Sequence, residues 1–460
     1  MTSISNSKEC FHPDLDIFCV PPTNTSVEKG NWIEINTTTT TNNGIIEFHH
    51  PGSEHYIHLS ETDFYCRVKI EVNDNNSWRP IKDTDKVGIT NNFLHSIFSQ
   101  VDVSIGNLTI ENSNKLYPYK AYITNLLNHD DENKQTDGLC HGWSTDTAGQ
   151  FNNINLEPLT YPELDTVAVK KIKLSDLSKT NPTNFGFLKR RDWVINSKSE
   201  VEMIGKLNSD LFNSNRYLLN NVPFTVKMTV NDSKFALLYD KEADCRFTIT
   251  SAVLLPRIAK ISPQVNLAHL ATLEKYTMKY PIKRIIVKSN LINQGVTEAT
   301  INFSNLSSTP NRIVFGMVLQ SASTGTKQEN PFEFKHFDLS SISVDIGGQA
   351  RPFSKSLDLN FEENRYIRPY YALSEHVRKP NKGHGIKYED FKGGSALFVY
   401  DLTPDLISGD CFNLIHRDNL AITLRFSKPT PSAISGITLM ESDNIIEGNK
   451  DLLFSCDYRI

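Results

Sequence analysis

The chain has 460 residues, enough for two or three domains, and its 48 Lys and Arg against 53 Asp and Glu give a formal net charge of −5. This balance argues against a nucleic-acid binder driven by overall charge, because phosphate contacts need concentrated Lys and Arg. The seven cysteines include no Cys-x-x-Cys pair, so they indicate neither a zinc ribbon nor a disulfide framework. No apolar run approaches the roughly 20 residues of a membrane span. No basic, apolar leader opens the sequence, so we expect no signal peptide and synthesis in a reducing cytosol.

The first 28 residues are predicted to form an extended arm. The stretch from Asp14 to Pro22 contains apolar residues but has no nearby element for them to pack against. Pro21 and Pro22 stop regular secondary structure, because proline lacks a backbone N–H. The apolar residues favour docking of this arm onto a neighbouring subunit.

Apolar residues at alternate positions predict strands in the first half of the chain. Short strands are expected at 32–35 and 45–48, and a longer one at 64–72. Residues 92–98 have helical spacing and precede a strand at 101–105. On this pattern, Cys66 and Cys245 are small buried residues of strands.

Two further segments lie between residues 128 and 199. Residues 128–165 form a long polar excursion with no regular spacing of apolar residues, and compact domains seldom carry such a loop without a function. The segment Lys189-Arg190-Arg191-Asp192-Trp193 is a short basic cluster. We interpret it first as a solvated loop, with contact to a genome or another acidic surface as the alternative.

The joint between the two halves of the chain is predicted to be helical. A strand at 245–255 ends at Pro256 and closes the first half. Ser262 supplies an N-cap and Pro263 a first helical residue for a helix at 263–276. This linker would hold the halves at a fixed angle.

The second half repeats the order of the first. Strands are expected at 282–288, 312–319, 342–346, 396–400 and near 437–441, with a loop rich in Lys, Gly and His at 375–394. Segment 101–107 matches 342–348, and segment 117–122 matches 368–373. In the clearest pair of copies the apolar positions align, namely Phe224, Val226, Met228 and Val230 with Leu420, Ile422, Leu424 and Phe426.

These matches between the two halves of the sequence predict a duplicated all-β fold. The copies lie too far apart for a solenoid, whose repeats are much shorter. Strands with few helices and long loops are typical of a β-sandwich or jelly roll, here used twice. Chance similarity between β-rich segments is the alternative.

No motif of known catalytic chemistry is present. The chain has no phosphate-binding loop, no Gly-x-Ser-x-Gly elbow and no His-Glu-x-x-His helix. Two places in the sequence put a histidine beside another potential metal ligand, His49 with His50 and His141 with Cys140. His49 and His50 would point to opposite faces of a strand, which makes a poor metal site. The acidic stretches 83–85 and 129–132 lack EF-hand spacing. We therefore assign no catalytic, cofactor-binding or metal-ligating residue, although paired carboxylates that meet only in three dimensions have no sequence pattern.

Several stretches, taken together, resemble the capsid proteins encoded by Polinton/Maverick elements and the related adintoviruses. No single motif is specific, but their order and spacing are, and they span nearly the whole chain. The stretches are Leu15–Thr23, Asn92–Val103, Tyr117–Tyr122, Asp146–Gly149, Arg216–Asn220, Asn330–Phe337, Asp401–Asp405 and Phe412–Leu414.

The resemblance implies a hexon-like major capsid protein with a double jelly roll. Its parts would be an arm at 1–28, a first jelly roll at 29–260 and a second at 261–460, beginning with the helical linker. Homotrimers would form pseudo-hexameric blocks of an icosahedral shell. The excursions 128–165 and 375–394 would be tower or inter-subunit loops.

The same resemblance implies a structural protein and not an enzyme. Its partners would be itself, neighbouring capsomers, and penton and other minor capsid proteins, with weak contact to packaged DNA as a further candidate. No cofactor, metal or small-molecule substrate is expected. The implied location is the virion, after synthesis in the host cytoplasm, with the nucleus as a candidate place of assembly.

Two other functions stay open. A minor capsid or penton component would need only one barrel, which the double repeat argues against. A tandem jelly roll that binds or processes glycans is the second alternative. A secreted protein of that kind would normally carry a signal peptide and disulfides.

Overall fold

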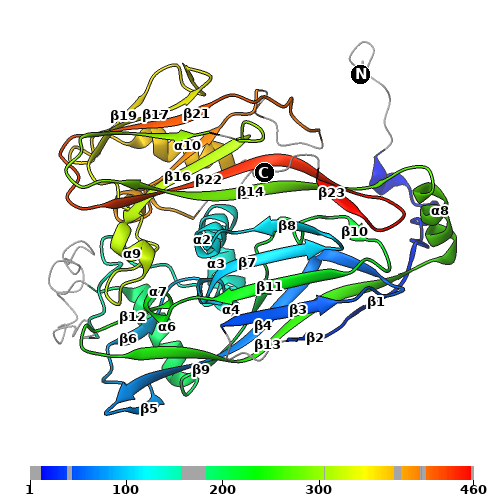
Figure 1. Cartoon of the computed structure of the whole chain (residues 1–460), viewed down its shortest axis with the longest axis horizontal. Helices are drawn as coiled ribbons and strands as arrows, with labels where there is room; N and C mark the ends of the chain where they lie inside the picture. The colour runs from blue at the N-terminus through cyan, green and yellow to red at the C-terminus, as the bar shows by residue number, and fades with distance from the viewer. Residues whose placement is uncertain are drawn as a thin grey trace.

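The computed structural model describes residues 12–38, 44–156, 183–304, 306–377, 385–404, 406 and 411–456. In this part of the chain two β-sandwiches with short helices lie against each other, one built from each half of the sequence (Figure 1). The predicted all-β class with two tandem sandwiches is therefore confirmed.

The first sandwich consists of two facing sheets and a small strand pair. One sheet has the order β1 (Val27–Trp32), β13 (Cys245–Ile261), β4 (Tyr56–Asp74) and β10 (Tyr217–Leu218), with β2 (Ile35–Asn36) beside β13 and with β5 (Ser77–Pro80) and β9 (Glu200–Lys206) beside β4. The facing sheet has the order β3 (Ile45–His50), β11 (Phe224–Val230), β7 (Phe98–Ile105) and β8 (Leu108–Asn112). The strand pair is β12 (Leu237–Tyr239) with β6 (Val87–Ile89).

The second sandwich repeats this arrangement. One sheet has the order β14 (Met278–Ile292), β22 (Ile434–Gly448), β16 (Arg312–Leu319) and β20 (Leu397–Asp401), with β23 (Phe454–Cys456) beside β22. The other has the order β15 (Glu298–Phe303), β21 (Leu420–Phe426), β17 (Leu339–Ile346) and β18 (Gln349–Ala350), with β19 (Leu357–Asp358) beside β17.

Short helices fill the connections between strands. In the first half they are η1 (Pro13–Leu15), α1 (Phe93–Ser96), α2 (Tyr117–Asn128), α3 (Asp131–Gln135), α4 (Asp137–Cys140), α6 (Phe185–Asn196) and α7 (Ser233–Ala236). From the joint onward they are α8 (Pro263–Leu273), α9 (Gln320–Thr324), α10 (Ile367–Val377) and α11 (Tyr388–Lys392). Within the described ranges, no helix has both the length and the apolar character needed to cross a membrane.

Strand pairing confirms the sequence repeat. β11 lies between β3 and β7, and β21 lies in the equivalent place between β15 and β17. Val226 of β11 pairs with Val103, and its aligned residue Ile422 of β21 pairs with Val344. Aligned residues therefore have aligned partners, and both sets of side chains are buried.

A bulge occurs at the same place in both halves. The pairing of β7 with β11 skips Ser99, and the pairing of β17 with β21 skips Ser340. Each serine hydroxyl donates to a backbone carbonyl of the partner strand, Ser99 to Thr229 at 3.3 Å and Ser340 to Arg425 at 2.9 Å. Chance similarity between β-rich segments does not explain a shared bulge with a shared hydrogen bond.

The predicted end of the strand 245–255 at Pro256 is wrong. β13 continues to Ile261 and pairs with β1 and β4 beyond the proline. The register with β4 shifts between Leu255 and Arg257, so Pro256 lies at a bulge. A bulge tolerates proline because the inserted residue needs no ladder hydrogen bond.

The linker helix α8 follows the prediction in part. Pro263 is in its first turn and Ser262 is at the N-cap position, but the Ser262 side chain makes no capping hydrogen bond. The helix ends at Leu273, and none of its residues is buried. It therefore joins the sandwiches at their edge, while their relative position is set elsewhere.

Candidate functional site: the buried junction between the two sandwiches

Helix α2 belongs to the cores of both sandwiches. Tyr117 and Ala121, four residues apart on one face, lie in the core of the first sandwich. Tyr119, Tyr122 and Ile123, on the other face, lie in the core of the second. A helix that is apolar all round is buried on all sides, and α2 is buried here as a shared wall.

Aromatic rings pack α2 against loops from both halves. Tyr122 stacks on Phe332 of the second half, with ring centroids 4.3 Å apart and planes 6° apart, and on Trp143 at 5.1 Å. Tyr119 meets Phe235 edge-on at 6.0 Å. Aromatic pairs in such geometries contribute about 0.5–1.5 kcal/mol each beyond their buried area.

A charged cluster occupies the first turns of the same helix. The Lys120 ammonium donates to Glu111 and, at 2.6 Å, to Asp210, and all three side chains are at most 4% exposed. Asp210 also accepts from the Ile285 backbone N–H of β14 at 3.1 Å, which links the second sandwich to the cluster. Burial raises the pKa of Asp210 to about 7, although Lys120 acts in the opposite direction. Burial alone would lower the pKa of Lys120, but its two carboxylate partners outweigh that effect and raise it.

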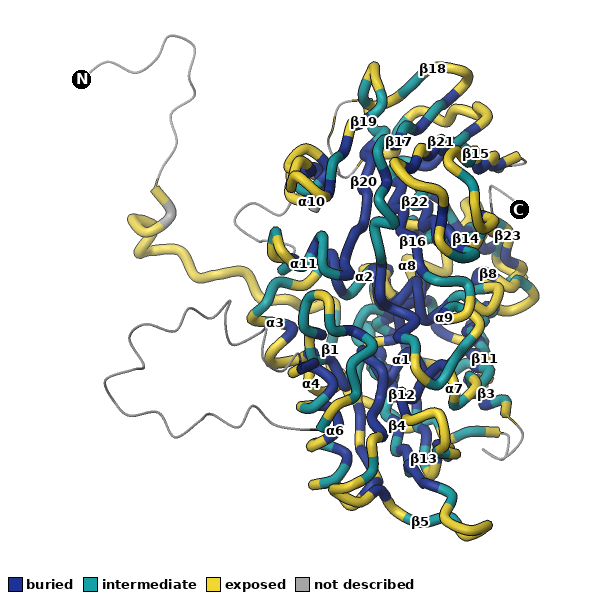
Figure 2. Tube along the Cα trace, turned by 90° about the vertical axis from the view of Figure 1, so that its left-hand side faces the viewer, coloured by how far each residue is buried: buried dark blue, intermediate teal, exposed yellow. Residues whose placement is uncertain are grey.

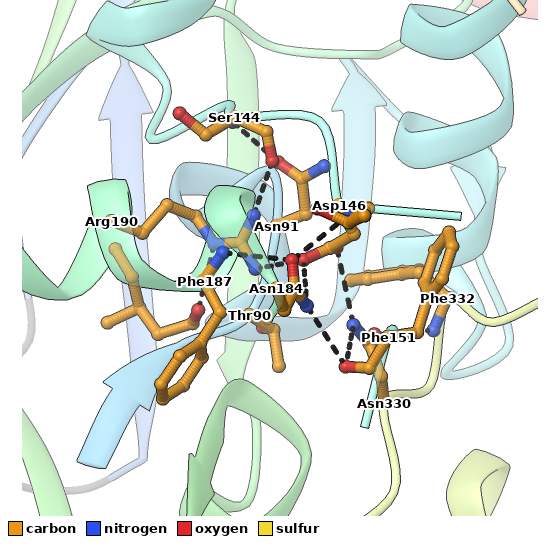
Figure 3. Close-up of polar contacts among 12 residues, drawn as sticks. Thr90, Asn91, Ser144, Asp146, Phe151, Asn184, Phe187, Arg190, Asn330 and Phe332 are labelled. Atoms are coloured by element: carbon orange, nitrogen blue, oxygen red, sulfur yellow. Dashed lines mark hydrogen bonds and ion pairs between the residues drawn. The ribbon is translucent and has the colours of Figure 1, made fainter. Parts of the chain in front are cut away.

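A second buried ion pair, between Arg190 and Asp146, lies among loops of both halves (Figure 3). Arg190 donates to Asp146 at 2.7 Å, to the Ile89 carbonyl at 3.0 Å and to the Ser144 carbonyl. Both charged side chains are at most 1% exposed. Buried charges need this degree of pairing, because the loss of solvation must be offset by several hydrogen bonds.

Two asparagines complete this network. The Asn184 amide donates to Asp146 at 2.8 Å and to the Phe151 carbonyl at 3.3 Å. Asn330, from the second half, donates to the other Asp146 oxygen at 3.3 Å and to the same Phe151 carbonyl at 3.4 Å (Figure 3). Asp146 therefore accepts hydrogen bonds from two segments that are distant in the sequence, α6 with its N-cap residue Asn184 and the loop that contains Asn330.

The described parts of the two long excursions lie in this junction. Residues 128–156 contain α3, α4, the buried Trp143 and Asp146, and residues 385–394 contain α11 with the buried Phe391. The Gly149 N–H donates to the Gly393 carbonyl at 2.6 Å, so the two excursions contact each other within one chain. These parts are therefore packed in the junction of their own chain and do not stand out from it as a tower. Contact of their exposed residues with a neighbouring subunit stays a prediction, and residues 157–165 and 378–384 lie outside the described residues.

Both interpretations of the basic cluster are wrong for its two arginines. The cluster forms part of α6, and Arg190 and Arg191 are 2% and 6% exposed. Arg191 donates to the backbone carbonyls of Asp83 at 2.5 Å and Asp85 at 3.2 Å. Both arginines lie on the inward face of the helix, where backbone carbonyls and Asp146 accept hydrogen bonds from their N–H groups. They are therefore neither solvated nor free to contact a genome.

The crowded histidines lie on a strand and beside the core of the first sandwich. His49 is exposed and His50 is buried on β3, as the strand period predicts. The ring centroids of His141 and His95 are 5.8 Å apart, and His95 Nδ1 is hydrogen-bonded to the Tyr117 hydroxyl at 2.9 Å. Burial lowers the pKa of His95 to about 3 and that of His141 to about 4.

The acidic stretches have structural partners. Asp85 forms an ion pair with Arg79 at 2.7 Å, and Asp130 caps α3 by accepting from the Asn133 N–H. In the ranges that the structure describes, no three His, Cys, Asp or Glu side chains come together as a metal site would require. Cys66 and Cys245 are buried in β4 and β13, as predicted.

Sequence reasoning missed the roles of the charged junction residues. Lys120 stands alone as a cation in the apolar segment Tyr117–Ile123, a signal that a buried partner exists. Asp146 and Asn330 were part of the family-like stretches, but nothing in their local pattern indicates that they bind each other. Their partners are far along the chain, and only the fold brings them together.

Comparison with known proteins identifies the fold. No family model matches the chain. An uncharacterized protein of Caenorhabditis elegans is 25% identical over 427 residues, covering 90% of this chain and 93% of that protein.

Three solved structures of viral capsids share the architecture at about one-tenth identity. The Sputnik virophage structure has a TM-score of 0.61 and 10% identity, covering 98% of this chain and 93% of its own. The faustovirus major capsid protein has a TM-score of 0.55 at 10% identity, covering 95% and 93%, and the mavirus major capsid protein 0.53 at 10%, covering 100% and 97%. The two tandem sandwiches of this chain therefore form the double jelly roll found in these viral major capsid proteins.

Proposed function

We propose that this chain is a viral major capsid protein whose homotrimers form hexon-like blocks of an icosahedral shell. The observation that carries this proposal is the double jelly roll itself, which is shared with structures of virophage and faustovirus capsid proteins that match 95% or more of the chain. A partial match, to one jelly roll only, would not support it.

Elementary geometry explains why this architecture suits a shell. Three copies of a chain with two similar sandwiches give a block with three-fold symmetry and a nearly six-sided outline. Such a block fits hexagonal positions only if the two sandwiches keep a fixed orientation relative to each other. The shared helix α2 and the charged network around Asp146 and Lys120 supply that rigidity.

The finer placement follows the sequence resemblance. The chain would belong with the capsid proteins of Polinton/Maverick elements and adintoviruses, with an arm at 1–28 and jelly rolls at 29–260 and 261–460. Neighbouring capsomers, pentons and minor capsid proteins would complete the shell in the virion. Any contact with packaged DNA would need residues other than Arg190 and Arg191, which are buried.

The solution mass of the purified chain tests this function. Light scattering should give a species of about three times the 52.1 kDa chain, and negative-stain images of the same fraction should show a six-sided outline. A variant with an aspartate in the junction, Tyr122→Asp, is the matched control, because it disturbs the relation of the two sandwiches without touching the outer surface.

Two outcomes would overturn the proposal. A monodisperse species of 52.1 kDa over the whole concentration range would exclude the closed trimer. A trimer that binds immobilised glycans specifically would favour the glycan-binding alternative. In the second case, hydrolase assays on the bound glycans would come next.

A further inference from the structure

The segment before β1 exposes apolar side chains that contact almost nothing in their own chain. Leu15, Ile17, Phe18 and Val20 are 63%, 76%, 92% and 88% exposed. Figure 2 shows the described part of this segment as an exposed, extended stretch of chain that leaves the body of the molecule. Four large apolar side chains in a row within six residues are a surface that water disfavours, so a covering partner is expected.

A matching cavity of about 500 Å³ lies at the same end of the molecule, beside α8. Its walls are mainly apolar and aromatic and include Val265, Leu273, Tyr276 and Met278. Leu267 and Leu270 of α8 are 66% and 44% exposed beside it. A concave, mostly apolar site of this size suits side chains such as those of the arm.

The charges of the arm and the cavity are complementary. Residues 12–26 contain Asp14 and Asp16 and no Lys or Arg. Arg216 and Lys279 line the cavity, and none of its described lining residues carries a carboxylate. Lys279 is already paired with Glu447 at 2.5 Å, so Arg216 is the cation that a partner can reach. Arg216 donates to the Lys279 carbonyl at 2.6 Å and, among the described residues, has no carboxylate partner. An acidic, apolar segment therefore fits this site better than a basic one.

The arm is directed away from the cavity of its own chain. Ser26, at the cavity wall, accepts a hydrogen bond from the Ser262 N–H at 2.9 Å, and its own N–H bonds the Asn24 side chain at 3.0 Å. Pro21 and Pro22 favour an extended backbone, and the apolar side chains before them, Leu15, Ile17, Phe18 and Val20, are exposed instead of packed in this cavity.

We infer that the apolar part of the arm of one copy, residues 12–20, docks into the cavity beside α8 of a neighbouring copy. Phe18 and its apolar neighbours fill the cavity, and Asp14 and Asp16 lie near Arg216. This inference rests on the proposed trimer, because it needs a second copy of the chain.

Cross-linking between two differently marked copies tests the docking. Both carry Cys10→Ser, Cys140→Ser, Cys411→Ser and Cys456→Ser, so that Cys66 and Cys245, which are buried, are the other thiols they share. One keeps Cys19 in its arm, and the other has Cys19→Ser together with Tyr276→Cys at the cavity, a residue that is 70% exposed. The two copies also carry different affinity tags. After co-expression and mild oxidation, a covalent species at twice the 52.1 kDa chain mass that carries both tags joins an arm to another copy's cavity.

Two controls set the expected result. Leu291→Cys replaces Tyr276→Cys in the first, because Leu291 is similarly exposed at 62% but lies at the other end of β14. It should give no covalent dimer. Phe18→Ser in the arm should lower the yield with Tyr276→Cys by about tenfold, because the largest apolar side chain of the arm no longer fills the cavity.

The outcomes separate this inference from the proposed function. Trimers that cross-link through Tyr276→Cys support both. Trimers by light scattering that give no cross-link, or that give as much with Leu291→Cys, overturn the docking and leave the capsid function standing. A monomer throughout overturns both, since no second copy is present.

Discussion

Lys120 lies between the carboxylates of Glu111 and Asp210 with 2% of its side chain exposed, so its removal would leave two buried acids without their cation. Breaking a buried charge pair by removing one partner typically costs about 3–5 kcal/mol. We expect Lys120→Met to lower the free energy of unfolding by this amount, measured by urea denaturation of the wild type and the variant.

The matched control removes all three charges together. In Lys120→Met with Glu111→Gln and Asp210→Asn, the amide oxygens still accept from the backbone N–H groups of residues 210 and 285. Most of the lost stability should return, because no unpaired charge stays buried. A loss of less than about 1 kcal/mol in Lys120→Met would show that water reaches the cluster and solvates the acids.

His95 should make the free energy of unfolding depend on pH, and one substitution can isolate its contribution. Burial lowers the pKa of this histidine to about 3, whereas an unfolded chain has a histidine pKa near the ordinary value of 6.5. Between these values the unfolded state binds a proton that the folded state does not. The free energy of unfolding therefore falls as the pH drops from 6.5 toward 3, by about 1.4 kcal/mol per pH unit for this residue.

His95→Asn should remove this part of the slope while keeping an acceptor for the Tyr117 hydroxyl. The wild type alone is a poor test, because the raised pKa of Asp210 has the opposite effect as the pH falls from 7. The difference in unfolding free energy between wild type and variant, followed from pH 7 to pH 4.5, isolates His95. Parallel curves would mean that the folded protein binds this proton as readily as the unfolded chain does.

At the scale of elements, the central strands were predictable because their signal is local. β11 and β21 bury every second residue, so their period of two is visible in the sequence itself, and their alignment identified the duplication. The helices near residues 93, 117, 263 and 367 were also signalled by local spacing or by proline in the first turn. Strand ends were less predictable, as β13 shows, because a bulge at Pro256 lets the strand continue.

The junction was not predictable, because its contacts join segments that are distant along the chain. Tyr122 stacks on Phe332, 210 residues later, and Lys120 meets Asp210, 90 residues later. Residues 128–156 have no period because they wrap the junction and belong to no repeated element. A polar, aperiodic stretch can therefore be a buried connection as well as a mobile loop, and its sequence does not distinguish the two.

At the scale of the whole molecule, the two sandwiches share so much buried surface that neither should fold alone. A first half that ended in α8 would expose Tyr119, Tyr122 and Ile123 of α2 to water and would deprive Asp210 of the Ile285 N–H. A second half alone would lack the ring of Tyr122 on which Phe332 stacks. Fully burying each such side chain stabilises by about 1.5–3 kcal/mol, and the net stability of a domain is only about 5–15 kcal/mol.

Splitting the chain in α8 tests this interdependence. The fragments 12–274 and 275–460 meet at an exposed helix with no buried residue, so the break itself removes no core contact. Expressed separately, each should be insoluble or lack a cooperative thermal transition. Co-expressed, they should purify together and unfold in one transition by calorimetry.

A protease site inserted between Glu274 and Lys275 of the intact chain gives the control, since cleavage after folding should leave both pieces associated. If 12–274 alone unfolded cooperatively, α2 would be a surface helix that the second sandwich merely covers. The two sandwiches would then be free to separate. The rigid relation on which a six-sided trimer depends would have to come from contacts between subunits instead of from α2.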